Sequence, residues 1–275
     1  MKVENREIEG IYYADDCVLP TDSIRGVDEK IEVLKKYEKE GGVSMNSEKS
    51  VCMVVNGVFD HASLPIEVVY EFKNLGIWVS DKSEKFSDSH LGRLEELMKS
   101  KRWEYFEWAY RLEFKDPKVL LHGLDIFVLR AILYGCEVWG ARIYRSVFDK
   151  LEKLYLNCLR WILCLLERTP KGIVFWDFNT FNMEYRIQER VLKFYNKLIS
   201  FSENSPVYFL ADRMVKRYRN MGRSYGNLLI KMVEPLGSRF VSCIINGEII
   251  DIRDWRETKK DVLRSAWVES VCFRE

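Results

Sequence analysis

The spacing of hydrophobic residues changes along the chain, and the first segment that it defines has the pattern of a β-hairpin. Apolar, strand-favouring residues stand on both sides of two adjacent carboxylates, Asp15 and Asp16, within about residues 9–19. The carboxylates therefore stand where the hairpin is expected to turn. Aspartate is also common in turns because its side chain bonds to its own backbone, so the pair alone fits either a metal site or an ordinary turn.

The following segment has a helical pattern and then a strand pattern. Apolar residues recur at threes and fours over about residues 22–39, which predicts a helix with one buried stripe. Gly41-Gly42 is expected to end it, because glycine readily adopts the left-handed conformation. Three short strands are predicted over residues 50–55, 66–70 and 73–79. A strand, a helix and further strands in this order predict a small antiparallel sheet with one helix.

Beyond about residue 80 the apolar spacing becomes helical. We predict helices over about residues 88–112, 117–139, 145–166, 181–201 and 207–220. Ser87 or Asp88 is expected to cap the first helix, whose core face includes Trp103 and Tyr110, and Asp116-Pro117 is expected to open the second. The second of these has almost no charge in its second half, so we expect it to be the central buried element. An Asn246-Gly247 dipeptide predicts a hairpin, and a last helix is expected over about residues 254–271. The predicted fold class is therefore α+β.

Composition narrows the class of protein. The 275 residues are 47% hydrophobic and include eight Trp, which is ample for a core and argues against bulk disorder. The seven Cys form no Cys-x-x-Cys pair, so we expect buried reduced thiols and no zinc site. No apolar run reaches membrane-spanning length, so no membrane association is expected and the predicted location is nuclear or cytoplasmic.

Charge is nearly balanced overall, at +1, but it is uneven along the chain. Residues 186–231 contain ten Lys or Arg and three acids, which gives this stretch a net charge of +7, and aromatic residues are interleaved among them. Such a stretch suits a surface that follows a phosphate backbone and stacks on bases. Arg213, Lys216 and Arg217 stand at threes and fours and are the candidate nucleic-acid-binding residues. The alternative is an ordinary solvated helix face.

Four stretches in order resemble one family. Tyr13-Ala14-Asp15-Asp16 resembles the Tyr-x-Asp-Asp catalytic box of reverse transcriptases, residues 41–55 resemble the next palm motif, and residues 72–77 resemble the primer grip. Residues 133–140, Leu-Tyr-Gly-Cys-Glu-Val-Trp-Gly, are similar to a thumb stretch of non-LTR (LINE-type) retrotransposon polymerases. The resemblance covers roughly residues 8–200 and is looser towards its end.

The resemblance implies an organisation and a chemistry. Residues 1–80 are expected to form the C-terminal part of a polymerase palm, residues 81–200 a helical thumb-like region, and residues 201–275 a helical extension. The implied activity is RNA-directed DNA polymerisation by two-metal nucleotidyl transfer. The expected partners are an RNA template and a DNA primer, and the expected cofactor is Mg²⁺, or Mn²⁺, with no other small-molecule cofactor besides the nucleotide.

Roles follow for individual residues. Asp15 and Asp16 are expected to bind the metal, and Lys49 is expected to neutralise the leaving pyrophosphate. Primer binding is expected at Phe72, Lys73, Leu75 and Gly76. The alternatives are a surface role for Lys49 at a strand start and a core role for the two apolar grip residues in a hairpin. Asn46 is expected to fix its loop through side-chain-to-backbone hydrogen bonds, and Tyr134, Glu137 and Trp139 are expected to have structural roles in the thumb.

One departure from the family bears on activity. In the family a further carboxylate and the nucleotide-binding fingers precede the Asp-Asp box by a long stretch, whereas fourteen residues precede Asp15 here. We therefore expect a fragment, the C-terminal half of a palm with its thumb, that is inactive on its own. Two other interpretations stay open, a non-catalytic nucleic-acid-binding module and a protein-interaction module.

Overall fold

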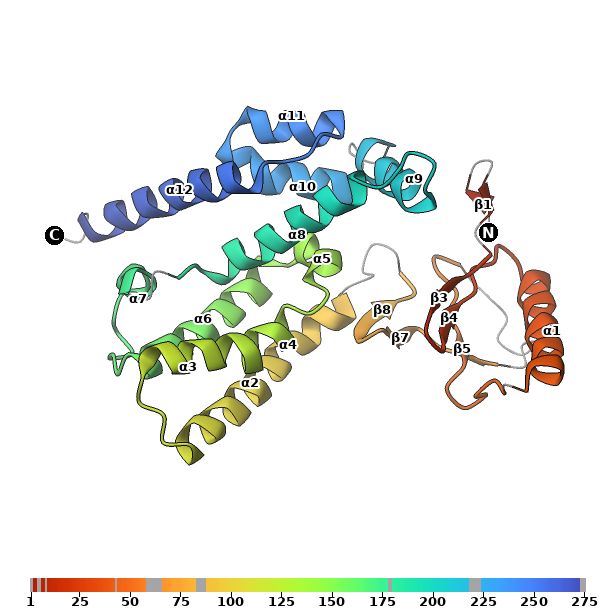
Figure 1. The fold of residues 1–275 in the computed structure, drawn as a ribbon, viewed down its shortest axis with the longest axis horizontal. Helices are drawn as coiled ribbons and strands as arrows, with labels where there is room; N and C mark the ends of the chain where they lie inside the picture. The colour runs from red at the N-terminus through yellow and green to blue at the C-terminus, as the bar shows by residue number, and fades with distance from the viewer. Residues whose placement is uncertain are drawn as a thin grey trace. The chain divides into compact units, whose positions relative to one another are not determined.

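The computed structural model is an α+β fold that forms two compact units (Figure 1). The first unit contains Met1–Asn74 and Ser80–Ser83, and the second contains Leu75–Val79 and Glu84–Glu275. The predicted mixed fold class is confirmed at this level. The structure describes residues 2–3, 6–7, 9–42, 44–57, 66–82, 88–177, 180–217 and 224–272.

The first unit begins with short hairpins and one helix. Strands β1 (Lys2–Val3) and β2 (Arg6–Glu7) pair antiparallel, as do β3 (Ile11–Tyr13) and β4 (Asp16–Val18). Helix α1 (Ile24–Gly41) follows. The Ser23 hydroxyl caps α1 by accepting from the Gly26 amide, and Gly42 ends it with a φ of 65°. The hairpin, the helix and its glycine stop thus agree with the prediction.

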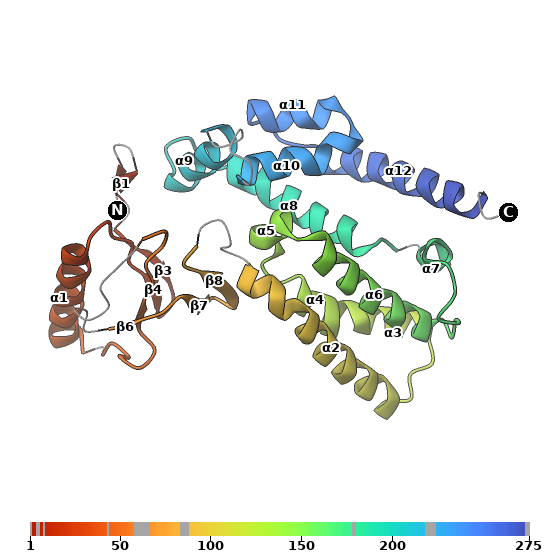
Figure 2. The ribbon, with the colours of Figure 1, turned by 180° about the vertical axis from the view of Figure 1, so that it is seen from behind.

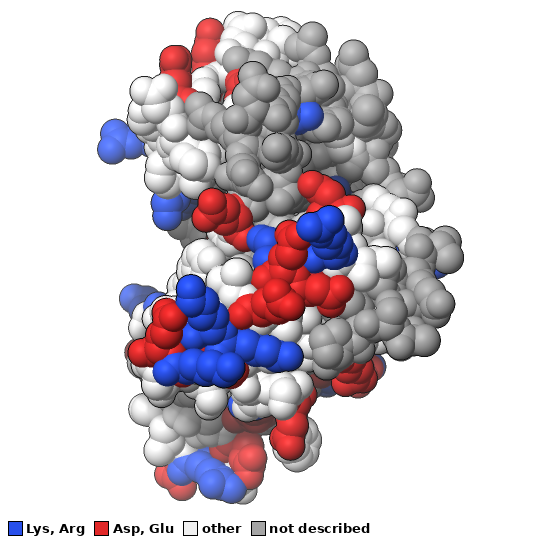
Figure 3. Space-filling view, turned by 90° about the vertical axis from the view of Figure 1, so that its right-hand side faces the viewer, with Lys and Arg blue, Asp and Glu red and all other residues white. Residues whose placement is uncertain are grey.

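The buried stripe predicted for α1 is only partly present. Ile31 is the buried residue of the helix, whereas Ile24 and Tyr37 are exposed. Ion pairs join Arg25 to Glu29 and Lys36 to Glu40 on its surface. Figure 3 shows that acidic and basic side chains are intermingled on this side of the molecule. An 18-residue helix with one buried side chain gains little from packing, so its caps and ion pairs matter more than usual.

The remaining strands differ from the prediction of one antiparallel sheet. Strands β5 (Val51–Cys52) and β6 (Glu67–Val68) pair in parallel, and β7 (Glu71–Asn74) pairs with β8 (Ile77–Ser80). The described strands therefore form four separate two-stranded sheets. The single strand predicted over residues 73–79 is wrong, because the chain reverses at Leu75 and Gly76, both of which have positive φ.

The second unit is helical. Its main helices are α2 (Asp88–Arg111), α3 (Pro117–Leu124), α4 (Arg130–Ile132), α5 (Cys136–Trp139), α6 (Arg145–Ile162), α7 (Lys171–Asp177), α8 (Met183–Ile199), α9 (Pro206–Asp212), α10 (Tyr225–Val233), α11 (Ser238–Asn246) and α12 (Ile252–Cys272). Helix α8 lies between the α2–α6 helices and the α10–α12 helices (Figures 1 and 2). The regions predicted as thumb and C-terminal extension therefore share one compact unit.

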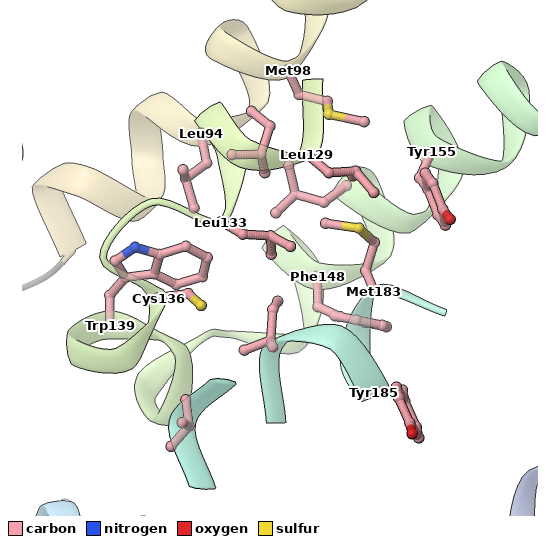
Figure 4. Packing of buried hydrophobic residues seen from close by; sticks show 14 of the residues in the cluster. Leu94, Met98, Leu129, Leu133, Cys136, Trp139, Phe148, Tyr155, Met183 and Tyr185 are labelled. Atoms are coloured by element: carbon pink, nitrogen blue, oxygen red, sulfur yellow. The ribbon is translucent and has the colours of Figure 1, made fainter. Parts of the chain in front are cut away.

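The predicted central helix is interrupted but buried. Asp116 caps α3 and Pro117 occupies its first turn, as predicted. A π-helix (η3, Asp125–Leu129) joins α3 to α4, and α5 follows after a turn in which Gly135 has a φ of 64°. Apolar side chains from these segments form the centre of the core with those of α2, α6 and α8 (Figure 4).

Two predictions about the helical unit are wrong. Trp103 and Tyr110 were expected on the buried face of α2, but they are 72% and 84% exposed. The Asn246-Gly247 dipeptide ends α11, with Gly247 in the left-handed conformation, and forms no hairpin. The Ser87 alternative for the start of α2 lies outside the described residues, and α2 itself begins at Asp88.

The C-terminal helices are tied to α8 by polar contacts. The Asn196 side-chain amide donates to the Ile250 carbonyl at 2.7 Å and accepts from the Ile250 amide at 2.9 Å. Arg256 pairs with Glu189, and the Tyr185 ring lies 5.2 Å from that of Trp255. These contacts satisfy backbone groups between α11 and α12 that packing alone would leave unpaired.

Within the described residues, no single helix has the length and apolar character of a membrane span. Pro117–Ile132 and Cys136–Arg142 meet those criteria only together, as a pair bent by 58°. Leu124, Val128 and Ile132 of this pair are buried in the helical core.

Candidate functional site

The Asp-Asp pair lies at the tip of the β3–β4 hairpin. Tyr13 pairs with Asp16, so the connecting turn consists of Ala14 and Asp15. Asp15 is thus in the turn, and Asp16 is the first residue of β4. Ala14 has a φ of 52°, a left-handed conformation that a residue with a Cβ adopts at a cost of about 1–2 kcal/mol. The short connection therefore places two carboxylates at one end of a hairpin.

The two carboxylates are open to solvent. Asp15 and Asp16 are exposed, and among the described residues neither side chain forms a hydrogen bond or an ion pair. Mg²⁺ is often bound through one or two carboxylates with water and substrate phosphates in the other positions, so the oxygen donors present fit that ion. Within the described part of the chain, His, Cys, Asp and Glu form no group of three or more with the geometry of a metal site.

The hairpin that carries the pair exposes large apolar side chains. Ile11, Tyr12 and Tyr13 are 60%, 70% and 66% exposed. Because neighbouring residues of a strand point to opposite faces, both faces of the hairpin are uncovered by described residues. Side chains of this size normally contribute several kilocalories per mole when buried, so the hairpin presents a surface suited to a further strand or layer.

Lys49 lies in a loop that Asn46 holds. The Asn46 side-chain oxygen accepts from the Lys49 amide at 3.2 Å, and the Asn46 carbonyl accepts from the Ser50 amide at 3.0 Å. The predicted structural role of Asn46 in fixing this loop is therefore confirmed. The Lys49 side chain is exposed, and among the described residues nothing joins it to Asp15 or Asp16.

The four predicted primer-binding residues belong to the β7–β8 hairpin. Phe72 is half-buried and Lys73 is exposed on β7, whereas Leu75 and Gly76 form the turn with φ values of 45° and 85°. Two successive positive φ values are typical of the tight turns that join antiparallel strands. The turn therefore presents Leu75 and Gly76 together at one end of the hairpin.

This turn contacts the 133–140 stretch of the helical unit. Tyr134 donates its hydroxyl proton to the Leu75 carbonyl at 2.7 Å. A Cβ on Gly76 would stand 2.9 Å from Cε1 of Tyr134, and one on Gly135 would stand 2.3 Å from Cδ1 of Ile77. Two stretches of the resemblance whose contacting residues are 59 positions apart therefore lie together. The role given to Tyr134 from sequence, structural within the thumb, missed this contact.

Several basic residues of the 186–231 stretch are engaged within the fold. Arg186 donates to the Thr180 hydroxyl at 2.8 Å and to the buried Tyr155 hydroxyl at 3.1 Å, and it pairs with Asp125. Arg190 donates to the Leu133 carbonyl at 3.3 Å. These cations stabilise the helical core, so they add less to a phosphate-binding surface than their charge suggests.

The three predicted nucleic-acid-binding residues lie in a π-helix, η5 (Arg213–Arg217). The α-helix predicted over residues 207–220 therefore ends at Asp212, and the α-helical spacing assumed for the three side chains does not apply. Arg213 is half-buried. The side chains of Lys216 and Arg217 lie outside the described residues, so their shared face stays a prediction.

The described cysteines differ in exposure, and Cys52 and Cys243 are intermediate. Cys136 and Cys158 are buried, and burial raises the pKa of each thiol to about 12. Cys17, opposite Tyr12 in the β3–β4 hairpin, and Cys164 are exposed. The prediction that the cysteines are buried is therefore wrong for these two.

Glu152 is a buried carboxylate whose role was not predicted from sequence. It lies on α6 and accepts a hydrogen bond from the Met183 amide at 2.9 Å, at the start of α8. Burial raises the pKa of Glu152 to about 6, while the Met183 amide and the charges of Lys171 and Arg145 oppose the rise. A glutamate at this spacing on an apolar helix gives no sequence signal of burial.

Comparisons of the chain with models of known protein families, with curated proteins and with solved structures found no match.

Proposed function

We propose that this chain supplies the C-terminal part of the palm, and the thumb, of an RNA-directed DNA polymerase of the non-LTR retrotransposon type. The observation that carries the proposal is the position of Asp15 and Asp16 at the exposed tip of a two-stranded hairpin with a two-residue turn. Helix α1, short strands, the β7–β8 hairpin and a helical unit follow in the chain, which is the order that the sequence resemblance requires.

The chain's own residues have separate tasks in this proposal. Asp15 and Asp16 bind the cation, which when bound supplies charge stabilisation at the reacting phosphate. Lys49 offers an ammonium group to the leaving pyrophosphate. The β7–β8 turn, with Lys73 beside it, contacts the sugar–phosphate backbone of the primer. The Gly76 backbone allows that close approach, because it carries no side chain.

The test is binding of a labelled DNA primer annealed to an RNA template. We expect binding that weakens steeply with salt and that Mg²⁺ or Mn²⁺ strengthens in the native chain but not in the Asp15→Asn, Asp16→Asn double variant. The matched control is Asp22→Asn, because Asp22 is an exposed acid outside the hairpin. Binding that is indifferent to divalent cations, or equal in the two proteins, would contradict the proposal.

Primer extension by this chain alone is expected to be absent with either cation. Two-metal nucleotidyl transfer requires more ligands than two adjacent carboxylates supply, together with a surface that holds the nucleotide. Template-dependent extension that disappears in Asp15→Ala would show that the chain is an active polymerase by itself.

One observation favours a second function, a protein-interaction module. Trp103 and Tyr110 lie seven residues apart on α2 and are both highly exposed, and the nearby acids Glu104 and Glu107 each form an ion pair with a basic residue of the same helix. Exposed Trp and Tyr anchors are typical of protein interfaces, and the bases beside them are already paired with acids and so offer less charge to phosphates. The Trp103→Ala, Tyr110→Ala double variant is expected to keep the native RNA affinity under this interpretation. A large loss of RNA affinity would instead assign α2 to nucleic acid.

A nucleic-acid-binding module without catalysis remains the other alternative, and its predicted residues are testable. Changing Arg213, Lys216 and Arg217 to Glu is expected to abolish most binding of single-stranded RNA at low salt, because it reverses the local field. Arg239→Glu on α11 is the control, since its side chain pairs with Asp254 outside the basic stretch. Equal affinity of the native and triple-Glu chains would exclude the stretch as a binding surface.

A further inference from the structure

Tyr134 connects the β7–β8 turn to the core of the helical unit. Its hydroxyl donates to the Leu75 carbonyl at 2.7 Å, and its own carbonyl accepts from Nε1 of Trp139 at 3.0 Å. Trp139 is fully buried, and the preceding residue, Leu133, is also buried. The backbone of Tyr134 is therefore fixed from the core side, while its ring reaches outwards to the turn.

The fit between the two segments depends on two glycines. Gly76 leaves space for the Tyr134 ring, and Gly135 leaves space for the Ile77 side chain. Both glycines have positive φ, so each supplies a backbone conformation and a close approach at once. Beside them the Arg93 guanidinium lies 4.2 Å from the ring centre of Trp78. Leu75–Val79 and Tyr134 belong to the same compact unit, so these contacts are internal to it.

The contact constrains a turn that is intrinsically unfavourable. Leu75 has a φ of 45°, which glycine or asparagine would adopt at less cost. A hydrogen bond to the Leu75 carbonyl selects this orientation of the peptide among those open to a free turn. Tyr134 is half exposed, so the bond lies at the surface of the unit, where a bound strand of nucleic acid has access to the turn.

We propose that Tyr134 is a positioning residue that holds the Leu75–Gly76 turn in the orientation in which the β7–β8 hairpin contacts the phosphate backbone of a primer strand. The inference rests on the proposed function, because that function assigns the hairpin to the primer. Tyr134 acts through the turn and touches no nucleic acid. Lys73, two residues before Leu75, supplies the positive charge of the contact.

The experiment measures the affinity for a labelled DNA primer annealed to an RNA template at two salt concentrations. Tyr134→Phe keeps the ring on Gly76 and removes only the hydroxyl. We expect a loss of affinity of about three- to tenfold, the size of one net hydrogen bond, and a shallower salt dependence as one phosphate contact weakens. Tyr37→Phe is the matched control, since Tyr37 is 62% exposed on α1 and belongs to no proposed binding surface. It is expected to match the native chain.

A double variant separates positioning from general stability. If Tyr134 acts through the hairpin, Tyr134→Phe is expected to cost no further affinity in a chain that already carries Lys73→Ala. Amide hydrogen exchange in the free protein supplies an independent measurement, and exchange over residues 75–79 is expected to accelerate in Tyr134→Phe but not in Tyr37→Phe.

Each outcome has a defined meaning. Native affinity and native exchange in Tyr134→Phe would overturn the inference alone. Losses that multiply in the double variant would also overturn it, because Tyr134 and Lys73 would then act independently. Absence of salt-dependent duplex binding in the native chain would overturn the proposed function and this inference together, whatever the exchange rates show.

Discussion

Replacement of Glu152 by Gln is expected to stabilise the helical unit near neutral pH. Glu152 is 8% exposed, and its carboxylate accepts from the Met183 amide at the start of α8. A glutamine keeps a side-chain oxygen for that amide and has almost the same shape, but it carries no charge. The substitution therefore removes the cost of burying a charge and keeps the hydrogen bond.

The magnitude follows from the pKa of Glu152, which burial raises from 4.5 to about 6. A pKa difference of one between the folded and unfolded states corresponds to about 1.4 kcal/mol, so the titration of this carboxyl changes the free energy of unfolding by about 2 kcal/mol. Because the pKa is higher in the folded state, the contribution is fully present below pH 4.5 and is lost as pH rises through about 6. At pH 7 the Gln variant is expected to be more stable by up to about 2 kcal/mol, and below pH 4.5 the two proteins are expected to converge.

Urea denaturation followed by tryptophan fluorescence at several pH values between about 4 and 7.5 measures this difference. All eight Trp lie in the second unit, so the signal reports its unfolding. Carboxylates that do not interact with Glu152 titrate equally in both proteins and cancel in the comparison. Among them is Glu189, whose pKa burial would raise but Lys193 and Arg256 lower. Glu152→Ala is the control that removes the acceptor, and it is expected to destabilise at every pH. A difference between native and Gln variant that does not change with pH would refute the reasoning.

The remaining predictions concern three other positions. Cys164 has a left-handed backbone conformation at the end of a helix, where its amide donates to the Trp161 carbonyl and the Leu165 amide donates to the Arg160 carbonyl. Because glycine adopts this conformation at less cost, Cys164→Gly is expected to raise the free energy of unfolding by about 0.5–1 kcal/mol, whereas Cys164→Ala is expected to leave it unchanged. Equal stability of the two variants in urea would contradict this. A Cβ on Gly226 would stand 2.5 Å from the Val215 carbonyl oxygen, so Gly226→Ala is expected to reduce the free energy of unfolding by about 1–3 kcal/mol and to lower the melting temperature. A Cβ on Gly92 of α2 would meet open space, so Gly92→Ala is expected to raise the melting temperature. The native chain is expected to bind Mn²⁺ weakly in calorimetry and the Asp15→Asn, Asp16→Asn variant is expected not to, and identical titrations would exclude a cation site at the hairpin tip.

Local chemistry made part of the fold predictable. The Asp15–Asp16 hairpin, the Ser23 cap, the Gly42 helix end and the Asp116-Pro117 helix start each depend on a few neighbouring residues, and all four occur in the structure. Such features are set by backbone conformation and side-chain hydrogen bonds within one turn, so a sequence shows them directly.

The errors arose where one local signal fits two structures or where distant neighbours decide. Asn246-Gly247 supplies a left-handed glycine, which both a hairpin and a helix end use, and the preceding apolar residues belong to α11. Leu75 gave no turn signal because leucine rarely adopts positive φ. Burial along α2 depends on which helices pack against it, so the apolar character of Trp103 and Tyr110 did not place them in the core.

The candidate site was predictable only where it depends on neighbouring residues. The tip of the β3–β4 hairpin is such a feature, but the contact between Tyr134 and Leu75 joins positions 59 residues apart. The engagement of Arg186 with Tyr155 and Thr180 likewise depends on the packing of α6 and α8, so a count of charges overstated the free basic surface.

The polar contacts between α8 and the C-terminal helices set an order of events during synthesis. Trp255 follows the end of α8, at Ile199, by 56 residues, and Ile250 pairs with Asn196 across a similar separation. At about 5–20 residues per second, a ribosome needs roughly 3–11 seconds to add that length. During this interval the nascent chain holds Tyr185 and Asn196 without their final partners. The emerging helical unit is therefore expected to expose part of its core until α12 has been made, and a chain truncated after α8 is expected to be prone to aggregation.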